Sequence, residues 1–499
     1  MPKNIIIFSD GTGQGSGLTL DELRSNVYKL YRATRSAPDT CISPDRQIAF
    51  YDPGLGSSLD SEHIRSDIWR KAYNILAQAM GLGLTRNIVD CYAFLLRHWE
   101  EGDRVYLYGF SRGAYTVRCL GGVMAYCGIP VTEGGKPVFR DPETAERIAR
   151  EAVIGVYQHG LGRKSERFKT QRHELALRFR EKYGSNVRPE WADTGWSNAV
   201  PYFIGVWDTV AAVGASAPRK LAMGAVILAV TWGLVSLVYW GLTLFFQPSW
   251  LTYQAWICAG VALAFIGAVL VYLRTHLAWS SETSYPLLQT LHFRAWKMAF
   301  YDKYLNPRVE YAKHALSIDE NRKDFRRVEW TYESSQGEGK SDDWFEQVWF
   351  AGVHSDVGGS YPETESRLSD IALGWMVERS LAAKDPILID EAYLRIYPDP
   401  SGIQHDEIKS GRMKWPRELR SVPEDAPLHP SVIERLKLDS VVHYDAPGKY
   451  RPSGLSRHRE AKSYFEEQLD DAVEEAASPR GLLVLLVAAA VLAGLFLMF

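Results

Sequence analysis

Residues 103–123, DRVYLYGFSRGAYTVRCLGGV, constrain the fold of this chain more than any other stretch. The apolar run at residues 105–108 predicts a buried strand, and a helical pattern follows the turn GFSRG. A GxSxG turn between a strand and a helix is typical of a nucleophile elbow, which lifts the hydroxyl of Ser111 clear of a sheet. Gly109 and Gly113 have no Cβ atom, so the strand and the helix can approach closely. The alternative is a glycine-rich turn whose serine only caps the helix.

The elements before this turn alternate between strands and helices. Strands are expected at residues 3–9 and 47–51, and helices at 22–33 and over most of 67–99. With the elbow they give the order β-α-β-α-β-α, which predicts an α/β fold with a doubly wound, mainly parallel sheet. Ligands of such sheets bind at the carboxyl ends of the strands, so catalytic groups are expected there.

Two later strand ends carry the other groups that a serine nucleophile needs. Asp208 follows the expected strand 202–206, and His354 follows the expected strand 347–353. The order Ser111, Asp208, His354 matches the order of an α/β-hydrolase triad. In that arrangement the histidine removes the serine proton and the aspartate orients the histidine. The alternative for Asp208 is a helix-capping role.

His314 competes with His354 for the role of base. It lies in residues 311–322, YAKHALSIDENR, which have a helical pattern. A helical histidine that points inward is more often a hydrogen-bonded part of the core than a catalytic group. We therefore favour His354 and keep His314 as the alternative.

The oxyanion hole is expected from the backbone N–H groups of Gly11 and Arg112. Gly11 and Gly13 follow the first strand and let the backbone pass close to a ligand, and Arg112 directly follows the nucleophile. A P-loop is excluded, because no GKS or GKT sequence ends this turn. The turn also resembles the DxDGT pattern of aspartyl phosphatases, but Phe8 stands where the nucleophilic aspartate would be.

Three apolar segments without a charged residue lie at 221–246, 255–273 and 482–499. The length of each is near the roughly 20 residues that cross a bilayer core. The first two predict a transmembrane helical hairpin and the third predicts a C-terminal transmembrane helix, with buried helices of a large core as the alternative for the pair. Basic residues flank the hairpin but not its link. The positive-inside rule therefore predicts an integral membrane protein with its catalytic domain in the cytoplasm.

Small residues in the apolar pair would let the helices of several copies pack into a homo-oligomer. They are Gly224, Gly233, Gly260 and Gly267.

The predicted organisation has five parts. In chain order they are the first part of an α/β-hydrolase domain (1–215, with an inserted helical cap at about 130–200), the transmembrane hairpin insertion (216–280), the second part of the hydrolase domain (281–383), a C-terminal soluble region (384–478) and the C-terminal transmembrane anchor (479–499).

Five motifs occur in this order along the chain: FSDGTG, GFSRGAYTVR, GVWDTVAAVG, HALSIDE and VWFAGVHSDVGGSYPE. Together they resemble the type VI secretion lipase-effector-like family of α/β-hydrolases, formerly a domain of unknown function. The resemblance covers about residues 3–215 and 285–383. It implies an α/β-hydrolase fold and phospholipase activity, with Ser111 as nucleophile, Asp208 as acid and His354 as base.

The expected function is that of a membrane-anchored serine hydrolase that cleaves acyl esters. The resemblance implies phospholipid as the substrate and the bacterial inner membrane as the location. No metal or organic cofactor is expected. The net charge of −3 gives no general attraction for nucleic acid. One alternative is a non-catalytic membrane scaffold or sensor with the same fold. Another is a metal-dependent hydrolase built on Asp10, Asp208, His354 and Asp356.

Overall fold

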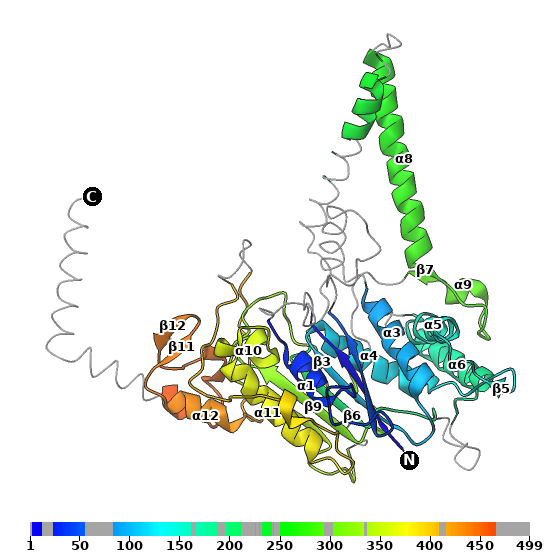
Figure 1. The fold of residues 1–499 in the computed structure, drawn as a ribbon. Helices are drawn as coiled ribbons and strands as arrows, with labels where there is room; N and C mark the ends of the chain where they lie inside the picture. Colours follow the sequence, from blue (N-terminus) through cyan, green and yellow to red (C-terminus); the bar gives the residue numbers. More distant parts are fainter. Residues whose placement is uncertain are drawn as a thin grey trace, which may run out of the picture.

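The central feature of the computed structural model is a sheet of six parallel strands, in the order β10-β9-β6-β3-β1-β2 (Figure 1). The strands are β1 (Asn4–Ser9), β2 (Gln47–Asp52), β3 (Arg104–Phe110), β6 (Phe203–Trp207), β9 (Tyr311–Ser317) and β10 (Phe345–Phe350). The structure describes residues 2–11, 23–54, 83–160, 166–186, 196–210, 225, 229, 232–241, 243, 250–293, 303–333, 337–408 and 416–465.

Helices cover both faces of this sheet. On β1, Ile5 and Ile7 belong to one apolar cluster, while Ile6 and Phe8 belong to another. This alternation buries both faces, as the period of two residues in a strand requires. Helices α3 (Leu84–His98) and α4 (Arg112–Cys127) cover the first face, and α1 (Asn26–Thr34) and α11 (Arg367–Leu381) cover the second. The predicted α/β fold with a doubly wound parallel sheet is confirmed.

The strand order reverses beside β1. Its neighbour β2 lies on one side, and β3, β6, β9 and β10 follow on the other. A switch point of this kind opens a crevice at the carboxyl ends of the strands. Gly11 follows β1 there, and Ser111 follows β3. The topology therefore brings these two segments together.

The helices of residues 130–200 lie beside the sheet's helical layer. They are α5 (Pro142–Arg150), the π-helical turn η2 (Glu151–Tyr157) and α6 (Glu166–Tyr183), preceded by a small hairpin of β4 (Thr132–Glu133) and β5 (Lys136–Pro137). Element α5 contacts α3, and η2 and α6 contact α4. Among the described residues they thus extend the α3–α4 layer sideways, and the predicted cap over the site is not confirmed.

Residues 311–317 form strand β9, so the helix predicted over 311–322 is wrong. The strand pairs with β6 on one side and β10 on the other. Its residues Ala312 to Ser317 are all buried. A central parallel strand has both faces covered and therefore loses the alternation that distinguishes a strand from a helix in sequence.

The second apolar segment lies within α8 (Trp250–His276), which projects from the body of the molecule (Figure 1). The described residues 232–241 are helical and pack against α8: the hydroxyls of Ser236 and Tyr253 are 2.9 Å apart, and Gly260 faces Val235. Beyond α8, β7 (Leu277–Ala278) pairs with β8 (His292–Phe293), with α9 (Leu287–Thr290) between them.

None of the helices in the described residues has both the length and the apolar character that spanning a membrane requires. The predicted transmembrane hairpin is therefore not supported. The first apolar segment, 221–246, lies largely outside the described residues, and the C-terminal anchor, 482–499, lies wholly outside them.

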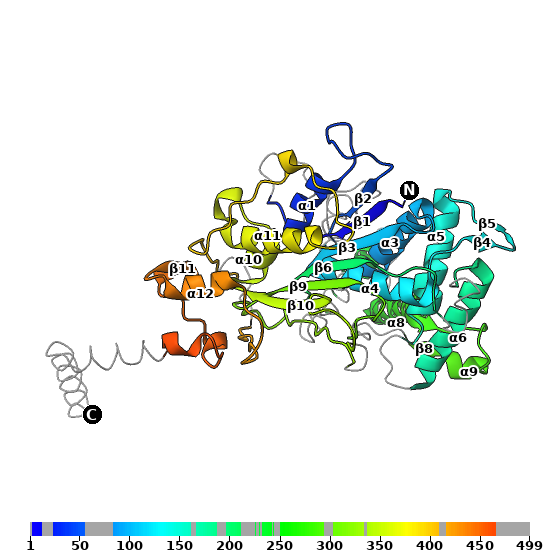
Figure 2. The same ribbon diagram turned by 90° about the horizontal axis from the view of Figure 1, so that it is seen from below.

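The C-terminal region packs on the sheet near β10, at the opposite end of the molecule from α5 and α6 (Figure 2). Trp349 on β10 and Leu316 on β9 share an apolar cluster with Val432, Leu436 and Tyr450. Besides α11, the elements from α10 onward are α10 (His354–Gly358), η5 (Glu363–Glu365), η6 (Glu391–Tyr393), α12 (Pro430–Lys437), β11 (Val441–His443), β12 (Ala446–Gly448) and η7 (Ser453–Leu455). This region therefore packs directly on the central sheet.

Candidate active site

The turn between β3 and α4 has the geometry of a nucleophile elbow. Ser111 has φ 58° and ψ −119°, a combination that L-residues rarely adopt. A Cβ atom at Gly113 would lie 2.0 Å from the carbonyl oxygen of Ser9, and one at Gly109 would lie 2.5 Å from the carbonyl oxygen of Gly113. Both glycines are therefore required by the close approach of strand and helix. The N–H of Ser111 donates to the carbonyl oxygen of Trp207, which ties the elbow to β6.

His354 and Asp208 are paired directly. The Nδ1 atom of His354 lies 2.5 Å from Oδ2 of Asp208. The Nε2 atom of His354 is buried and has no hydrogen-bond partner among the described residues. This arrangement leaves the outer ring nitrogen available for a substrate or a nucleophile, which is the nitrogen that a triad base uses.

Two aromatic rings hold the imidazole in place. Phe110, next to Ser111 in the chain, stacks on it with ring centroids 4.6 Å apart, and Phe325 meets it edge-on at 5.2 Å. The contact with Phe110 makes the elbow and the imidazole neighbours. In the described residues no hydrogen bond joins Ser111 to His354. In proteins without substrate, such catalytic hydrogen bonds are often long and tighten only when substrate binds.

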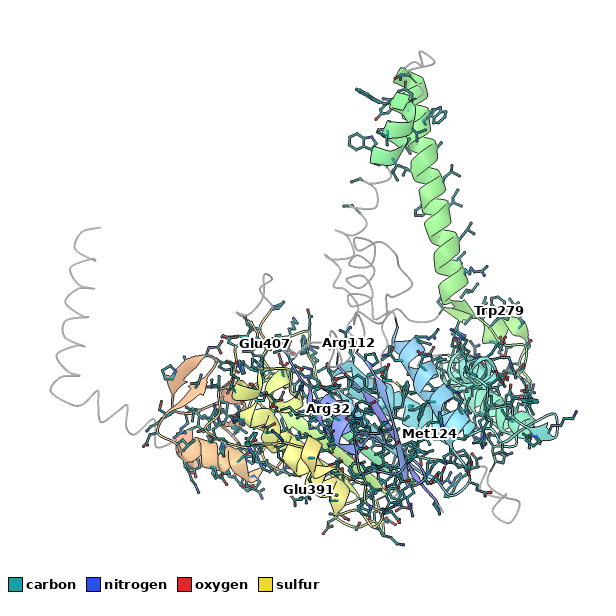
Figure 3. The ribbon with its side chains drawn as sticks, in the orientation of Figure 1. Arg32, Arg112, Met124, Trp279, Glu391 and Glu407 are labelled. Atoms are coloured by element: carbon teal, nitrogen blue, oxygen red, sulfur yellow. The ribbon has the colours of Figure 1, made fainter. Side chains whose placement is uncertain are left out.

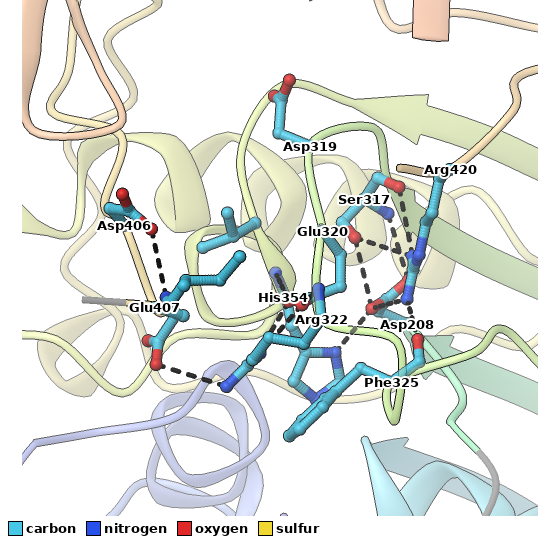
Figure 4. Close-up of polar contacts among 12 residues, drawn as sticks. Asp208, Ser317, Asp319, Glu320, Arg322, Phe325, His354, Asp406, Glu407 and Arg420 are labelled. Atoms are coloured by element: carbon cyan, nitrogen blue, oxygen red, sulfur yellow. Dashed lines mark hydrogen bonds and ion pairs between the residues drawn. The ribbon is translucent and has the colours of Figure 1, made fainter. Parts of the chain in front are cut away.

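Asp208 lies at the end of β6 and is fully buried (Figure 4). Its oxygens accept hydrogen bonds from the N–H of Ser317 and from both terminal nitrogens of Arg420. Burial alone would raise the pKa of the Asp208 carboxyl, but Arg420 and His354 hold that pKa well below its usual range. The carboxylate is thus ionised, as the acid of a triad must be to stabilise an imidazolium.

His354 begins the one-turn helix α10, whose start is anchored by a second ion pair. The backbone N–H of His354 donates to Oε2 of Glu320, 3.1 Å away. Arg322 holds that carboxylate with two hydrogen bonds of 2.8 Å, one to each oxygen. The guanidinium carbon of Arg322 lies 3.5 Å from the ring centroid of Phe325, the residue that also touches the imidazole. Backbone and ring of His354 are therefore fixed by one connected set of groups.

His314 is buried in the middle of the sheet. Its Nε2 accepts from the N–H of Thr209 at 3.3 Å, and its Nδ1 lies 3.3 Å from Oε1 of Gln347. Burial and the nearby Arg118 lower the pKa of His314 well below its usual value. His314 is a hydrogen-bonded core residue, and the structure pairs Asp208 with His354 instead.

The two residues predicted for the oxyanion hole flank the elbow. A Cβ atom built on Gly11 would lie 3.4 Å from Cβ of Ser111, so Gly11 lies close to the nucleophile. The N–H of Gly11 donates to Oδ1 of Asp10, 2.7 Å away. Arg112 is the first residue of α4, and burial lowers the pKa of its guanidinium to about 10. The N-terminus of a long helix favours negative charge, which suits an oxyanion.

The four residues of the metal-dependent alternative are engaged elsewhere. Asp10 accepts from the hydroxyls of Ser25 and Tyr51, and Asp356 accepts from Nδ1 of His405 at 2.7 Å. Across the part of the chain that the structure describes, no three histidine, cysteine, aspartate or glutamate side chains are grouped so as to hold a metal ion.

Several residues that contact the site were not predicted from the sequence. Ser317 and Glu320 lie in HALSIDE, and this motif was a usable signal, because it ends at the strand edge where the site lies. Arg420 had no such signal, since it lies in a proline-rich stretch far from the other site residues. Only the packing of the C-terminal region brings it to Asp208.

Comparison with protein families decides the kinship. The model of the family described as "T6SS, Phospholipase effector Tle1-like, catalytic domain" matches residues 3–235 and 274–379, well over half of the chain. The chain belongs to this Tle1-like family. Membership supports a phospholipase or lipase role. The stretch between the two matched parts, 236–273, contains most of α8, which is therefore an insertion relative to the Tle1-like catalytic domain.

The matches to individual proteins are weaker than the family match. The uncharacterized protein YEL023C of Saccharomyces cerevisiae is 33% identical over 132 residues, which are 26% of this chain. The match spans only 18% of the length of that yeast protein. A crystal structure of an uncharacterized protein from Pseudomonas aeruginosa aligns with 80% of this chain and 48% of its own, at 15% identity and a TM-score of 0.29.

Proposed function

We propose that this protein is a serine hydrolase that cleaves acyl esters of phospholipids through Ser111, His354 and Asp208. The observation that carries the proposal is the Asp208–His354 pair beside the elbow, with Nε2 of the imidazole buried and unbonded among the described residues. A base whose inner nitrogen is bonded to a carboxylate and whose outer nitrogen is free is set up to accept a proton.

The proposed reaction follows from these positions. Ser111 attacks the ester carbonyl while Nε2 of His354 takes its proton, and the alcohol leaves with that proton as the acyl-enzyme forms. Water then attacks the acyl-enzyme, again with His354 as base, and releases the fatty acid. The imidazolium formed in each half is stabilised by Asp208. No cofactor takes part in either half of the proposed reaction.

The oxyanion would be bound by the N–H of Arg112 and by an N–H near Gly11. The position of Arg112 at the start of α4 supports the first of these donors. The N–H of Gly11 donates to Asp10, so it has to exchange that bond for the oxyanion when substrate binds. Removing one donor of an oxyanion hole typically lowers kcat by about 10²–10³-fold.

The exposed apolar surface of α8 supports a lipid substrate. Large side chains on α8 are well exposed, with exposed fractions of 69% for Leu263, 69% for Phe265 and 60% for Leu270. Several large apolar side chains exposed on one projecting helix are typical of an interaction site. Figure 3 places Trp279 at the base of α8 and Arg112 at the edge of the body from which α8 rises. We propose that α8 holds the protein on a lipid bilayer, with the catalytic domain in the cytoplasm.

A fluorophosphonate probe and a short-chain 4-nitrophenyl ester test the chemistry. The parent protein in detergent should hydrolyse the ester and form one adduct at Ser111, and the Ser111→Ala variant should do neither. Equal ester hydrolysis by parent and variant would remove Ser111 from the nucleophile role. If the folded parent forms no adduct and cleaves no ester, the alternative of a non-catalytic scaffold or sensor is favoured. Release of fatty acid from phospholipid vesicles by the parent alone would establish the substrate class.

A further inference from the structure

Arg420 comes to the site from the C-terminal region, beyond residue 379 at which the family match ends. Its Nη1 lies 2.5 Å from Oδ1 of Asp208, and its Nη2 lies 3.0 Å from Oδ2 (Figure 4). The two parallel contacts form the fork in which a guanidinium best matches a carboxylate. Both oxygens of Asp208 are thereby fixed in one orientation.

The guanidinium is itself held rigidly. Nη1 also donates to the carbonyl oxygen and the hydroxyl of Ser317, at 3.1 and 2.7 Å, and Nη2 donates to the carbonyl oxygen of Phe325 at 2.8 Å. The Arg420 side chain is only 9% exposed. These partners lie on the strand and loop that also contact His354, so the guanidinium, the carboxylate and the imidazole share one framework.

A buried carboxylate needs this partner for two reasons. An unpaired charge in a protein interior is strongly unfavourable, and Asp208 without Arg420 would retain only His354 as a charged hydrogen-bond partner among the described residues. It would also act on the imidazole with its full negative charge, because Ser317, which donates to both of its oxygens, is uncharged. Arg420 offsets part of that charge while leaving Oδ2 bonded to Nδ1 of His354.

We infer that Arg420 is a positioning residue of the proposed hydrolase: it aims Asp208 at His354 and offsets part of the negative charge that the carboxylate presents to the imidazole. This inference rests on the proposed function. The hydrogen bonds of Arg420 in the described residues go to Asp208, Ser317 and Phe325, so it acts on His354 through Asp208. The charged and titratable groups around the pair in the described residues include Glu320 and Arg322 after β9, Arg327 further along the same loop, His314 on β9 and Asp356 on α10.

The inference predicts a pH effect that a purely structural role would not produce. Removing the guanidinium exposes the imidazolium to the full charge of Asp208, so the imidazolium holds its proton to higher pH. The acid limb of kcat/KM should then move upward by roughly one to two pH units. The loss of orientation should also lower kcat by about 100-fold or more at the optimum.

The test compares full-length variants on a soluble 4-nitrophenyl ester between pH 5 and pH 10. Arg420→Ala should show the loss and the shift, and added guanidinium ion should partly reverse both. Arg420→Lys keeps a charge but loses the fork, so its loss and its shift should be smaller. Arg435→Lys is the matched control, because Arg435 is a buried arginine of the same region that donates to the carbonyl oxygens of Pro400, Gly402 and Val442.

The outcomes distinguish failure of the proposed function from failure of the inference about Arg420. Parent activity that survives Ser111→Ala would overturn the proposed function, and this inference with it. The inference alone would be overturned by a different result. In that result the activity depends on Ser111, and Arg420→Lys and every folded Arg420→Ala sample keep the pH profile of the parent. The inference would also be overturned if the Arg420 variants lose activity without a pH shift and Arg435→Lys loses activity to the same extent. Arg420 would then have only a structural role. If Arg420→Ala does not fold, the lysine variant and its profile decide.

Discussion

The ring of Phe110 lies on the imidazole of His354, with their centroids 4.6 Å apart. Phe110 is the residue before Ser111 in the elbow, and His354 is the first residue of α10. Gly358, at the end of the same short helix, leaves the space that this ring fills, because a Cβ atom there would lie 1.9 Å from a ring carbon of Phe110. The elbow and the histidine are therefore fitted to each other through one aromatic ring.

Gly358→Ala should disturb this fit. The added methyl group displaces Phe110, so fluorophosphonate labelling of Ser111 should slow at least about 10-fold, and stability should fall by about 1–3 kcal/mol. Gly374→Ala on α11 is the matched control, because its nearest neighbour would be Ile396 at 3.4 Å and alanine favours a helix. Labelling rates and thermal melts of the two variants give the answer. Equal rates in both would show that the stacking has no role in the site.

The two candidate bases are separated by His354→Gln and His314→Gln. The first should lower kcat by about 10⁴–10⁶-fold with little change in stability, as expected for a triad base. The second should cost about 1–3 kcal/mol of stability, because it disturbs the buried hydrogen bonds to Thr209 and Gln347, but should keep measurable activity. Ester hydrolysis and urea unfolding measure both effects. The reverse pattern would make His314 the base.

His405 predicts a pH-dependent contribution to stability. Burial alone would lower the pKa of His405, but the carboxylates of Asp356 and Glu365 raise it above its usual value. A raised pKa gives stability that is fully present below the unfolded-state value of about 6.5 and is lost as pH rises through the folded-state value. The parent should therefore exceed His405→Gln in unfolding free energy more at pH 6 than at pH 8.5. Urea unfolding at both pH values measures this.

His429→Gln serves as the comparison with opposite sign. Burial lowers the pKa of His429 to about 4, so the native state resists its protonation. Its contribution to stability should be present above about pH 6.5 and should shrink as pH falls toward 4. If His405→Gln and His429→Gln change stability in the same sense with pH, the interpretation of the His405 ion pairs is wrong.

Gly113→Ala should abolish the elbow. The new Cβ atom would meet the backbone of Ser9 and Asp10, which has no flexible end that can move aside. Misfolding or a loss of more than about 3 kcal/mol is expected, together with loss of the Ser111 adduct. Gly121→Ala on the same helix meets only side-chain carbons at 3.4 Å or more and should fold normally. Similar melting temperatures for the two variants would contradict the elbow geometry.

The proposed lipid contact is tested by placing charges on α8. A triple variant, Leu263→Asp, Phe265→Asp and Leu270→Asp, should lower binding to phospholipid vesicles by more than about 100-fold, because each side chain contributes about 1.5–3 kcal/mol when buried in an apolar phase. Turnover of the soluble ester should stay at the parent level. Phe139→Asp, at a residue 79% exposed and far along the chain from α8, is the control. Vesicle flotation that is equal for all three proteins would remove α8 from membrane contact.

Much of the fold followed from local patterns. The strands that became β1, β2, β3, β6 and β10 and the elbow between β3 and α4 were all predicted close to their observed bounds, because apolar runs and glycine turns mark them directly. Asp208 and His354 were placed by the same logic, as polar residues directly after buried strands. Such signals are local, and a single sequence contains them.

The rest depended on packing that no local pattern records. Strand β9 reads as a helix because its alanines and leucine suit a helix, and only its place between β6 and β10 makes it a strand. Arg420 lies far along the chain from Asp208, and the fork between them exists only because the C-terminal region folds back onto β9 and β10. The contact between Arg420 and the acid could therefore not be predicted from the sequence.

The position of Arg420 affects where members of this family can be truncated for expression and how they are classified in genome surveys. A fragment ended at the boundary of the catalytic-domain match would contain Ser111, Asp208 and His354 and would satisfy any search for the three residues. It would nevertheless leave a buried carboxylate without its guanidinium. Inactivity of such a fragment would reflect where it was cut, and it would not argue against the chemistry of the whole chain.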